Sequence, residues 1–331
     1  MRNCVFGLLL AAAFALLLTT GEAAKKYSYY RVGSASDITT ATTAGTVLMG
    51  GGTDVDAAFQ WMCEKAGNGD FLVIRTTGTD AYNPYIYDLC PGVNSVATLI
   101  VPTATAANDP FVVSAIQSAE AIWIAGGDQS TYITYWKGTS LQSELNSAIG
   151  RGVPVGGTSA GMMVLTQFVY SALLTQGVTS SQALADPFTK YITLDRDFVG
   201  IDLLSNTIGD SHFVTRDRMG RELAFMCRVA ANGWTQMPRG IAVDEQTALL
   251  IDESGGTTVA GTGTAYFLAA PGPAQVCQPK KPLTYAGVGV YRIRNGGTFD
   301  LARWAGSGGV SYSVSATAGV LSSTQAGGSI Y

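Results

Sequence analysis

The sequence predicts an α/β protein built on a mainly parallel sheet with helices on both faces. Three segments share an apolar β-type run, a glycine-rich turn and a helical stretch, at 46–67, 121–138 and 153–174. Two further apolar runs, 71–77 and 98–102, lie between them. Strands that alternate with helices and are apolar throughout are typical of parallel sheets covered on both sides. Because ligands bind at the carboxyl ends of such strands, the glycine turns and Ser159 are expected at one sheet edge.

The first segment places an apolar strand before Gly50-Gly51-Gly52 and a helix after it. The triplet does not match a dinucleotide fingerprint, because Val55 stands where the third glycine should be. We also find no phosphate loop with its Lys-Ser/Thr, so no nucleotide cofactor is expected. Helical stretches around 110–120 and 140–150 complete the alternating pattern.

After residue 240 the chain changes to short β-type runs with glycine turns. The runs at 288–294 and 298–304 flank Asn295-Gly296 and predict a hairpin. Residues 305–331 are rich in Gly, Ser and Thr and carry no charge. We therefore expect a catalytic α/β domain over 24–304 and a C-terminal β-rich extension or loose tail over 305–331.

Residues 1–23 have the pattern of an export signal. Arg2 precedes an apolar run from Val5 to Leu18, and Gly21-Glu22-Ala23 offers small residues for cleavage. The run is shorter than the ~20 residues of a membrane span, so an uncleaved anchor is the weaker alternative. We expect a secreted, extracellular protein with no membrane contact after cleavage.

Composition excludes one class of partner. The chain is 47% hydrophobic, 13% charged and has a formal net charge of −4. It has no cluster of lysine and arginine of the kind that a phosphate backbone requires, so no nucleic-acid partner is expected. The oligomeric state, monomer or homodimer, stays open.

Four cysteines remain after the signal: Cys63, Cys90, Cys227 and Cys277. An even number in an exported chain suggests up to two disulfides. Neighbour pairing, Cys63–Cys90 and Cys227–Cys277, is our prediction among three pairings, and four buried free thiols are the alternative.

The stretch VPVGGTSAGMM at 153–163 holds one serine between small residues, directly after a strand and before a helix. Ser159 is either a nucleophile on a sharp turn or an ordinary N-cap hydroxyl. The match to G-x-S-x-G resembles the elbow of α/β-hydrolases, where the acid precedes the histidine. Here the best acid follows His212, which is the wrong order for that fold.

A serine nucleophile needs a base, and His212 is the one histidine of the sequence. Asp210 precedes it, and Arg216, Arg218 and Arg221 follow it. Alternatively, Arg218 and Arg221, which are three residues apart, lie on a solvent-exposed helix face. The supporting carboxylate is Glu245 or Asp244, only one of which can reach His212, because neighbours in a strand point to opposite faces. With one histidine and no CxxC or HExxH, no metal site is expected.

Four motifs in this order resemble the cyanophycinases of serine peptidase family S51. They are GGDQ at 126–129, GGTSAG at 156–161, DSHF with R-x-R-x-x-R at 210–221, and GIAVDEQTAL at 240–249, and the resemblance covers 46–252. It implies a flavodoxin-like fold and a serine-type exopeptidase. Its substrate would be cyanophycin, a polyaspartate with arginine on each side chain, cut into β-aspartyl-arginine dipeptides.

The resemblance assigns Ser159 as nucleophile, His212 as base and Glu245 as acid, with Gly127 and Ala160 N–H groups as the oxyanion hole. The residues implied to line the substrate pocket are Gln129, Asp210, Ser211, Arg216, Arg218 and Arg221. Arginines would hold substrate carboxyl groups, while Asp210 or Gln129 would receive a guanidinium.

Some residues depart from the family pattern. Met162 and Met163 follow the elbow where small residues are commoner, and Ser211 replaces an amide found in some members. Segments 76–90 and 172–200 look particular to a secreted branch. Two alternatives stay open: a relative acting on other aspartyl peptides, and a catalytically silent binding protein of the same fold.

Overall fold

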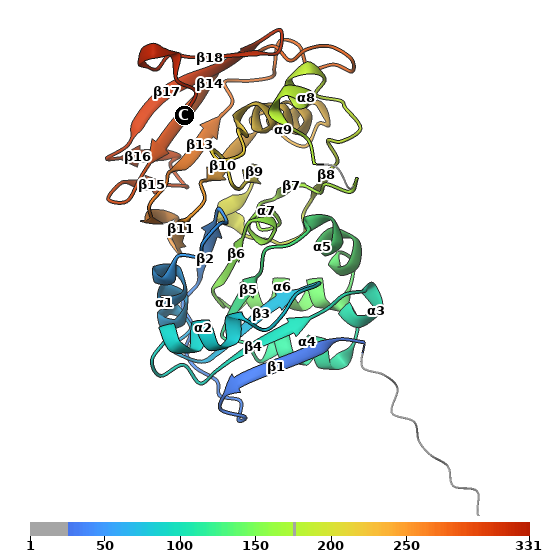
Figure 1. Cartoon of the computed structure of the whole chain (residues 1–331), viewed down its shortest axis with the longest axis vertical. Coiled ribbons are helices and arrows are strands. Elements are labelled where there is room, and N and C mark those ends of the chain that lie inside the picture. The colour runs from blue at the N-terminus through green and yellow to red at the C-terminus, as the bar shows by residue number, and fades with distance from the viewer. Residues whose placement is uncertain (1–25, 175–176) are drawn as a thin grey trace, which may run out of the picture.

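The computed structural model describes residues 26–174 and 177–331, and within them the chain forms two sheets of ten and eight strands (Figure 1). The expected signal segment, 1–23, lies outside the described residues. No helix in the described ranges has the length and apolar character needed to cross a membrane.

The first sheet has the alternating architecture that the sequence predicts. In spatial order its strands are β1 (Ser28–Gly33), β4 (Ser95–Ile100), β3 (Asp70–Arg75), β5 (Ala121–Ile124), β6 (Val155–Thr158), β2 (Gly45–Met49), β11 (Thr247–Asp252), β12 (Gly256–Gly261), β15 (Thr298–Asp300) and β16 (Ala305–Ser307). The central strands β4, β3, β5, β6 and β2 run parallel, and the flanking strands pair antiparallel. The order β4-β3-β5-β6 is the 2-1-3-4 order of flavodoxin-like sheets, and β2 occupies the fifth place.

Helices cover both faces of this sheet, as expected. Alternate residues of one strand pack to opposite sides, as Leu72 and Val73 of β3 do. On one side lie α1 (Asp56–Lys65) and α2 (Tyr82–Leu89). On the other lie α3 (Ala104–Ala107), α4 (Pro110–Gln117), α5 (Gln129–Trp136) and α6 (Ser140–Gly150). The fold is therefore α/β, with the predicted helices near 110–120 and 140–150 in place.

The second sheet contains most of the described strands after residue 165. In spatial order its strands are β18 (Val320–Ser323), β17 (Val310–Thr317), β14 (Tyr285–Ile293), β13 (Ala265–Ala269), β10 (Arg239–Val243), β9 (Thr207–Asp210), β7 (Phe168–Tyr170) and β8 (Leu194–Arg196). Here β7, β9 and β10 are parallel. The helices α8 (Ser180–Ala185) and α9 (Met219–Ala231) accompany this sheet, and α9 packs on its core (Figure 1). The short helix η1 (Asp202–Leu204) lies between β8 and β9, and η2 (Ala326–Gly328) follows β18.

Two local predictions were wrong. The helix expected to reach residue 174 is only α7 (Ala160–Met163), because the Thr166 hydroxyl donates to the Phe168 carbonyl at 2.9 Å and β7 then pairs with β8 and β9. The hairpin expected around Asn295-Gly296 does not form. Its two strands lie in different sheets, because β14 pairs with β13 and β17 while β15 pairs with β12 and β16.

Residues 305–331 extend both sheets at their edges, through β16 in the first and β17–β18 in the second. This is the C-terminal β-rich extension of the fold. Segments of the chain that pass between the sheets, such as the one joining β10 to β11, bring the ends of strands from both sheets together.

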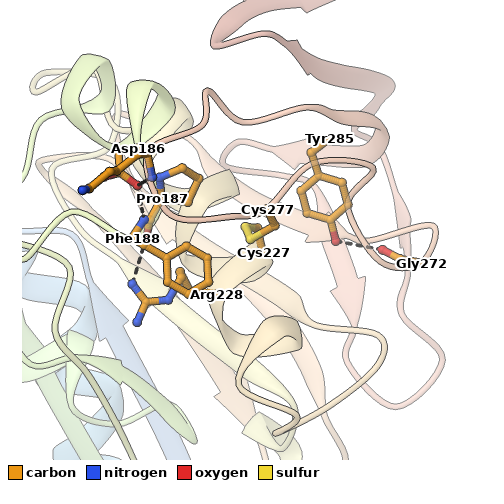
Figure 2. The surroundings of a disulfide bond; sticks show 9 residues. Asp186, Pro187, Phe188, Cys227, Arg228, Gly272, Cys277 and Tyr285 are labelled. Atoms are coloured by element: carbon orange, nitrogen blue, oxygen red, sulfur yellow. Dashed lines mark hydrogen bonds between the residues drawn. A yellow bond between two sulfur atoms is a disulfide. The ribbon is translucent and has the colours of Figure 1, made fainter.

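The cysteines pair as neighbours along the chain. Cys63 of α1 lies at disulfide distance from Cys90 at the end of α2, with 6.2 Å between Cα atoms. Cys227 of α9 pairs with Cys277, with 6.1 Å between Cα atoms (Figure 2). Beside this second pair, Arg228 stacks on Phe188 at 4.2 Å and donates to the Pro187 carbonyl at 3.0 Å. The second disulfide therefore joins α9 to the segment before β14.

Candidate active site

Ser159 sits on a strained turn between β6 and α7. Its backbone angles are φ 53° and ψ −116°, a conformation that costs a non-glycine residue energy. The turn is possible because its neighbours lack side chains: a Cβ on Gly157 would lie 2.5 Å from the Gly161 carbonyl carbon, and one on Gly161 would lie 2.0 Å from the Ile124 oxygen. The hydroxyl makes no capping bond to α7. The N-cap interpretation is therefore wrong, and the geometry is that of a nucleophile elbow.

The Ser159 hydroxyl contacts His212 instead. Its Oγ lies 2.7 Å from Nε2 of the imidazole, and Nδ1 of the same ring lies 2.5 Å from Oε1 of Glu245. His212 follows β9, has φ 46°, and is buried. With Nδ1–H donating a hydrogen bond to Glu245, Nε2 is left as the acceptor for the serine hydroxyl.

The glycine triplet has a role that the sequence analysis missed. The Gly50 carbonyl accepts from the His212 N–H at 2.8 Å, and the Gly51 carbonyl accepts from the Gln246 N–H at 2.8 Å. A Cβ on Gly51 would lie 2.4 Å from Cε1 of His212. The triplet thus supports the backbone on both sides of the imidazole and leaves room for the ring. Its only signal in the sequence was the run of three glycines after a strand.

The two candidate acids have different surroundings. Asp244 points away from the imidazole and accepts from the N–H groups of Val214 at 3.1 Å and Thr264 at 3.2 Å. Burial raises the pKa of Asp244 to about 6. The hydrogen bond from His212 lowers the pKa of Glu245, whose side chain is 27% exposed. Glu245 is therefore the carboxylate paired with the histidine.

The imidazole is held in its neutral form. Burial is the main cause that lowers the pKa of His212 below 6.5, and the charges of Arg216 and Arg218 add to it, while the bond to Glu245 opposes both. A neutral imidazole beside a hydroxyl can accept its proton. Serine, histidine and glutamate thus form a chain of hydrogen bonds suited to nucleophilic catalysis.

Asp210 does not line the pocket as predicted. It is fully buried, and its carboxylate accepts from Nε of Arg221 at 2.7 Å, Nη2 of Arg221 at 2.6 Å and Nη1 of Arg218 at 3.0 Å. Although burial alone would raise the pKa of Asp210, the two guanidinium groups hold it below its usual range. Because its oxygens are already engaged by two arginines, the prediction that Asp210 receives a substrate guanidinium is wrong.

A pocket of about 340 Å³ opens beside Ser159. The predicted residues that line it are Gly127, Gln129, Ser159, Ala160, Ser211, Arg216, Arg218 and Arg221. Arg218 and Arg221 are tied to Asp210, whereas Arg216 is exposed and its guanidinium has no acceptor within 26–174 and 177–331. Met163 lies on the pocket wall, close to the Gln129 amide nitrogen.

The glycine turns and Ser159 share one sheet edge, as expected, because they follow the neighbouring parallel strands β2, β5 and β6. The histidine that contacts Ser159 comes from the other sheet. Ser159 follows β6 of the first sheet, but His212 and Glu245 follow β9 and β10 of the second. The site lies where the strand ends of both sheets meet, near β2, β6 and β9 in Figure 1. Within the described residues, no group of three His, Cys, Asp or Glu side chains is placed to hold a metal ion.

Comparison with known proteins agrees with this geometry. The family model described as peptidase family S51 matches residues 94–259, half of the chain. The chain belongs to peptidase family S51. The matched segment includes Ser159, His212 and Glu245, while Gly50–Gly52 and the C-terminal strands lie outside it.

Among the curated proteins similar to this chain are cyanophycinases. The chain is 24% identical over 209 residues to the enzyme of Synechococcus elongatus, covering 61% of this chain and 60% of that one. It is 27% identical over 150 residues to that of Geminocystis herdmanii, covering 45% and 49%. The chain therefore spans about 60% or less of the length of these relatives.

One solved structure similar to this chain is a peptidase from an acI-B1 actinobacterium. The TM-score is 0.49, the identity is 17%, and the match covers 78% of this chain and 98% of the other.

Proposed function

We propose that this S51 member is an exported serine-type exopeptidase that hydrolyses cyanophycin to β-aspartyl-arginine dipeptides. The observation that carries the proposal is the hydrogen-bonded series from Ser159 through His212 to Glu245, on a strained elbow at the floor of an arginine-lined pocket. The substrate class, cyanophycin, is taken from the names of the curated relatives, which are cyanophycinases.

In the proposed first step, Oγ of Ser159 attacks the scissile carbonyl while Nε2 of His212 takes the hydroxyl proton. Glu245 stabilises the resulting imidazolium through Nδ1–H. The N–H groups of Gly127 and Ala160, both at the pocket wall, would donate to the oxyanion. The C–N bond then breaks, the leaving amine takes the proton from Nε2, and an acyl-enzyme remains.

The second step repeats the first with water. His212, neutral again, removes a proton from a water molecule as it attacks the acyl carbonyl. The ester bond breaks, Nε2 returns the proton to Oγ of Ser159, and the product carboxylic acid leaves. The lowered pKa of His212 keeps the base unprotonated at the start of each step.

Substrate recognition would divide between charged and polar groups. Arg216, exposed at the pocket and without an acceptor in the described part of the chain, is suited to a substrate carboxylate. The amide nitrogen of Gln129 donates to the Tyr170 carbonyl at 3.3 Å, which leaves its amide oxygen available for a guanidinium. With Asp210 already engaged, Gln129 is the remaining predicted acceptor.

Export is part of the proposal because a polymer substrate would then be met outside the cell. It is supported by the sequence pattern of residues 1–23 and by two cysteine pairs at disulfide distance. The test is N-terminal sequencing of the protein collected from the culture medium. Recovery only in the cell pellet, with the first residues intact, would contradict export.

The decisive test of function is incubation of the purified protein with purified cyanophycin, followed by mass spectrometry of the products. We expect β-aspartyl-arginine dipeptides from the wild type and none from Ser159→Ala. Products from other β-aspartyl peptides, with cyanophycin left intact, would instead favour the second candidate, an S51 peptidase for shorter aspartyl substrates. No turnover of either substrate would contradict both and leave a binding protein.

A further inference from the structure

Helix α9 begins without a cap of its own. Its N-cap residue, Arg218, makes no side-chain capping bond. The first N–H groups of a helix lack partners within the helix and need acceptors from elsewhere. Two distant hydroxyl groups supply them: Oη of Tyr331 accepts from the Met219 N–H at 2.9 Å, and Oγ of Ser180 accepts from the Arg221 N–H at 3.1 Å.

The same Tyr331 hydroxyl makes a second bond. It donates to Oδ1 of Asp217 at 2.8 Å, at a residue with φ 48°. The ring of Tyr331 also meets Phe213 edge-on, with centroids 5.6 Å apart, and lies 6.2 Å from the ring of Tyr266. Tyr331 therefore contacts the segment that precedes α9 at Phe213 and Asp217, and the first residue of α9 at Met219.

That segment carries the charged machinery of the site. It runs from His212 to Arg218 and is closed on itself by backbone bonds from Arg216 to His212 at 3.1 Å, from Asp217 to Val214 at 3.0 Å and from Arg218 to Phe213 at 2.9 Å. With positive φ at both His212 and Asp217, it is a tight loop. Its backbone bonds connect Asp217 to the residue that carries the imidazole, so we expect a displacement at Asp217 to reach His212.

We infer that Tyr331 is a positioning residue that fixes the loop of His212, Arg216 and Arg218 against Ser159. This inference rests on the proposed function, because it assigns Tyr331 an influence on both the base and the substrate-binding arginines. The C-terminal extension, residues 305–331, then supports the site, although it lies outside the residues that the family model matches.

The variant Tyr331→Phe removes the hydroxyl and keeps the ring packed against Phe213. The matched control is Tyr285→Phe, because Tyr285 lies in β14 of the second sheet and its hydroxyl donates to the Gly272 carbonyl at 3.0 Å, beside the Cys227–Cys277 pair (Figure 2). A second variant, Asp217→Asn, keeps an acceptor oxygen but loses its charge.

The first measurement needs no substrate. Since His212 is the one histidine of the sequence, its imidazole signals in an NMR titration are assigned without ambiguity. When the loop loosens, the ring becomes more hydrated, so we expect its pKa to rise toward the ordinary value in Tyr331→Phe. Asp217→Asn should give a smaller rise, and Tyr285→Phe should titrate like the wild type.

The second measurement is steady-state kinetics on cyanophycin. We expect Tyr331→Phe to lower kcat/KM about tenfold, the effect of a small misplacement of catalytic groups. Both a lower kcat and a higher KM should contribute, because the loop carries the base and the arginines. In the double variant with Asp217→Asn the effects should not add, since both act through one bond.

Three outcomes would overturn the inference. They are an unchanged His212 titration in Tyr331→Phe, a fall in kcat proportional to the unfolded fraction with KM unchanged, or an equal effect in Tyr285→Phe. If Tyr331→Phe does not fold, the same criteria apply to Asp217→Asn. If the wild type releases no dipeptides while the His212 pKa still shifts, the proposed function fails and the positioning role stands.

Discussion

The two sheets contribute to the site in opposite ways. The first sheet supplies Ser159 and surrounds it with residues that have no side chain, the glycines of 50–52, 126–127 and 156–161. The second sheet supplies charged side chains, with His212 and Glu245 in contact and Asp210 buried between two arginines. The first region depends on glycines, whose lack of a side chain leaves room for close contacts. The second depends on charged groups that pair with one another.

This difference determines how each region fails. At Gly50, Gly51, Gly157 and Gly161, an added Cβ would lie within 2.5 Å of backbone or ring atoms, because the space is already filled. Removing one charge from the second sheet leaves a buried partner without compensation. Substitutions in the first region should therefore damage geometry, and those in the second should damage stability or charge balance.

The largest effect is expected from Ser159→Ala. The variant should lose activity on the order of 10⁴-fold or more, as serine triads do, because no other group can form the acyl-enzyme. Its unfolding midpoint in urea should stay close to that of the wild type, since the change removes a single oxygen atom from a partly buried side chain and leaves the backbone unchanged. Cyanophycin turnover measured against urea unfolding checks both, and a variant with most of its turnover would remove Ser159 from the mechanism.

The next effect concerns stability in the second sheet. Asp210→Asn leaves Arg221 and Arg218 without a counter-charge in a buried setting, and we expect a loss of about 3–5 kcal/mol in the free energy of unfolding. The control is Glu144→Gln, which breaks the partly exposed pair with Arg151 at 2.8 Å and should cost about 1 kcal/mol or less. Urea denaturation measures both. Equal losses would show that burial of the Asp210 group does not matter.

The third effect tests the first sheet directly. Gly51 and Gly92 have similar φ angles, 98° and 90°, but a Cβ on Gly51 would meet the His212 ring, whereas one on Gly92 would meet nothing within 4 Å. Alanine at either position should cost about 1 kcal/mol of stability through the backbone. Only Gly51→Ala should also lower kcat, by about 100-fold, because it displaces the imidazole. Similar kcat values in the two variants would contradict the proposed role of the triplet.

The sequence predicted most of the fold, because its signals were local. Apolar strands before glycine turns identified β2, β5 and β6, and the elbow motif placed Ser159 between strand and helix. The order of the motifs also predicted His212 and Glu245 as partners of Ser159, and the structure places His212 in contact with Ser159 and Glu245 in contact with His212. The choice of Glu245 over Asp244 came from the family resemblance alone, since strand geometry shows only that one of the two can reach the imidazole, and the structure places Glu245 there.

What the sequence could not predict depends on pairing between distant strands. The parallel pairing of β9 with β10 places His212 and Glu245 in a second sheet, and the pairing of β15 with β12 prevents the expected hairpin. The burial of Asp210 follows from the same cause. A carboxylate beside three arginines in the sequence is compatible with a pocket or with an internal ion pair, and only the packing of α9 on β9 distinguishes them.

A smaller effect is expected at the arginine that is not tied to Asp210. Arg216→Ala should lower kcat/KM on cyanophycin by roughly 10- to 100-fold, the size of a lost charge-assisted hydrogen bond to a substrate carboxylate. Arg216→Lys should recover only part of it, because lysine lacks the planar fork. Steady-state kinetics of both variants provide the measurement. Wild-type kinetics in Arg216→Ala would show that this arginine belongs to a solvated face.

The smallest effect is a shift in pH dependence. His212 must be neutral to accept the serine proton, so kcat/KM should be present above its folded pKa and fall as the pH drops through it. Because the folded pKa lies below 6.5, the acid limb of the profile should have its midpoint below that value.

The lowered pKa of His212 also affects stability. Its contribution to the free energy of unfolding is complete above about 6.5, its ordinary pKa, and is lost toward lower pH, since the unfolded state binds the proton more tightly. The charge of Arg216 helps to depress the pKa, so the acid midpoint in Arg216→Gln should move upward, toward the unperturbed value. Profiles of kcat/KM from pH about 4 to 8, the range in which histidine titrates, measure the acid midpoint in the wild type and in Arg216→Gln. A downward shift, or an acid midpoint above 6.5 in the wild type, would mean that a group other than His212 controls the acid limb.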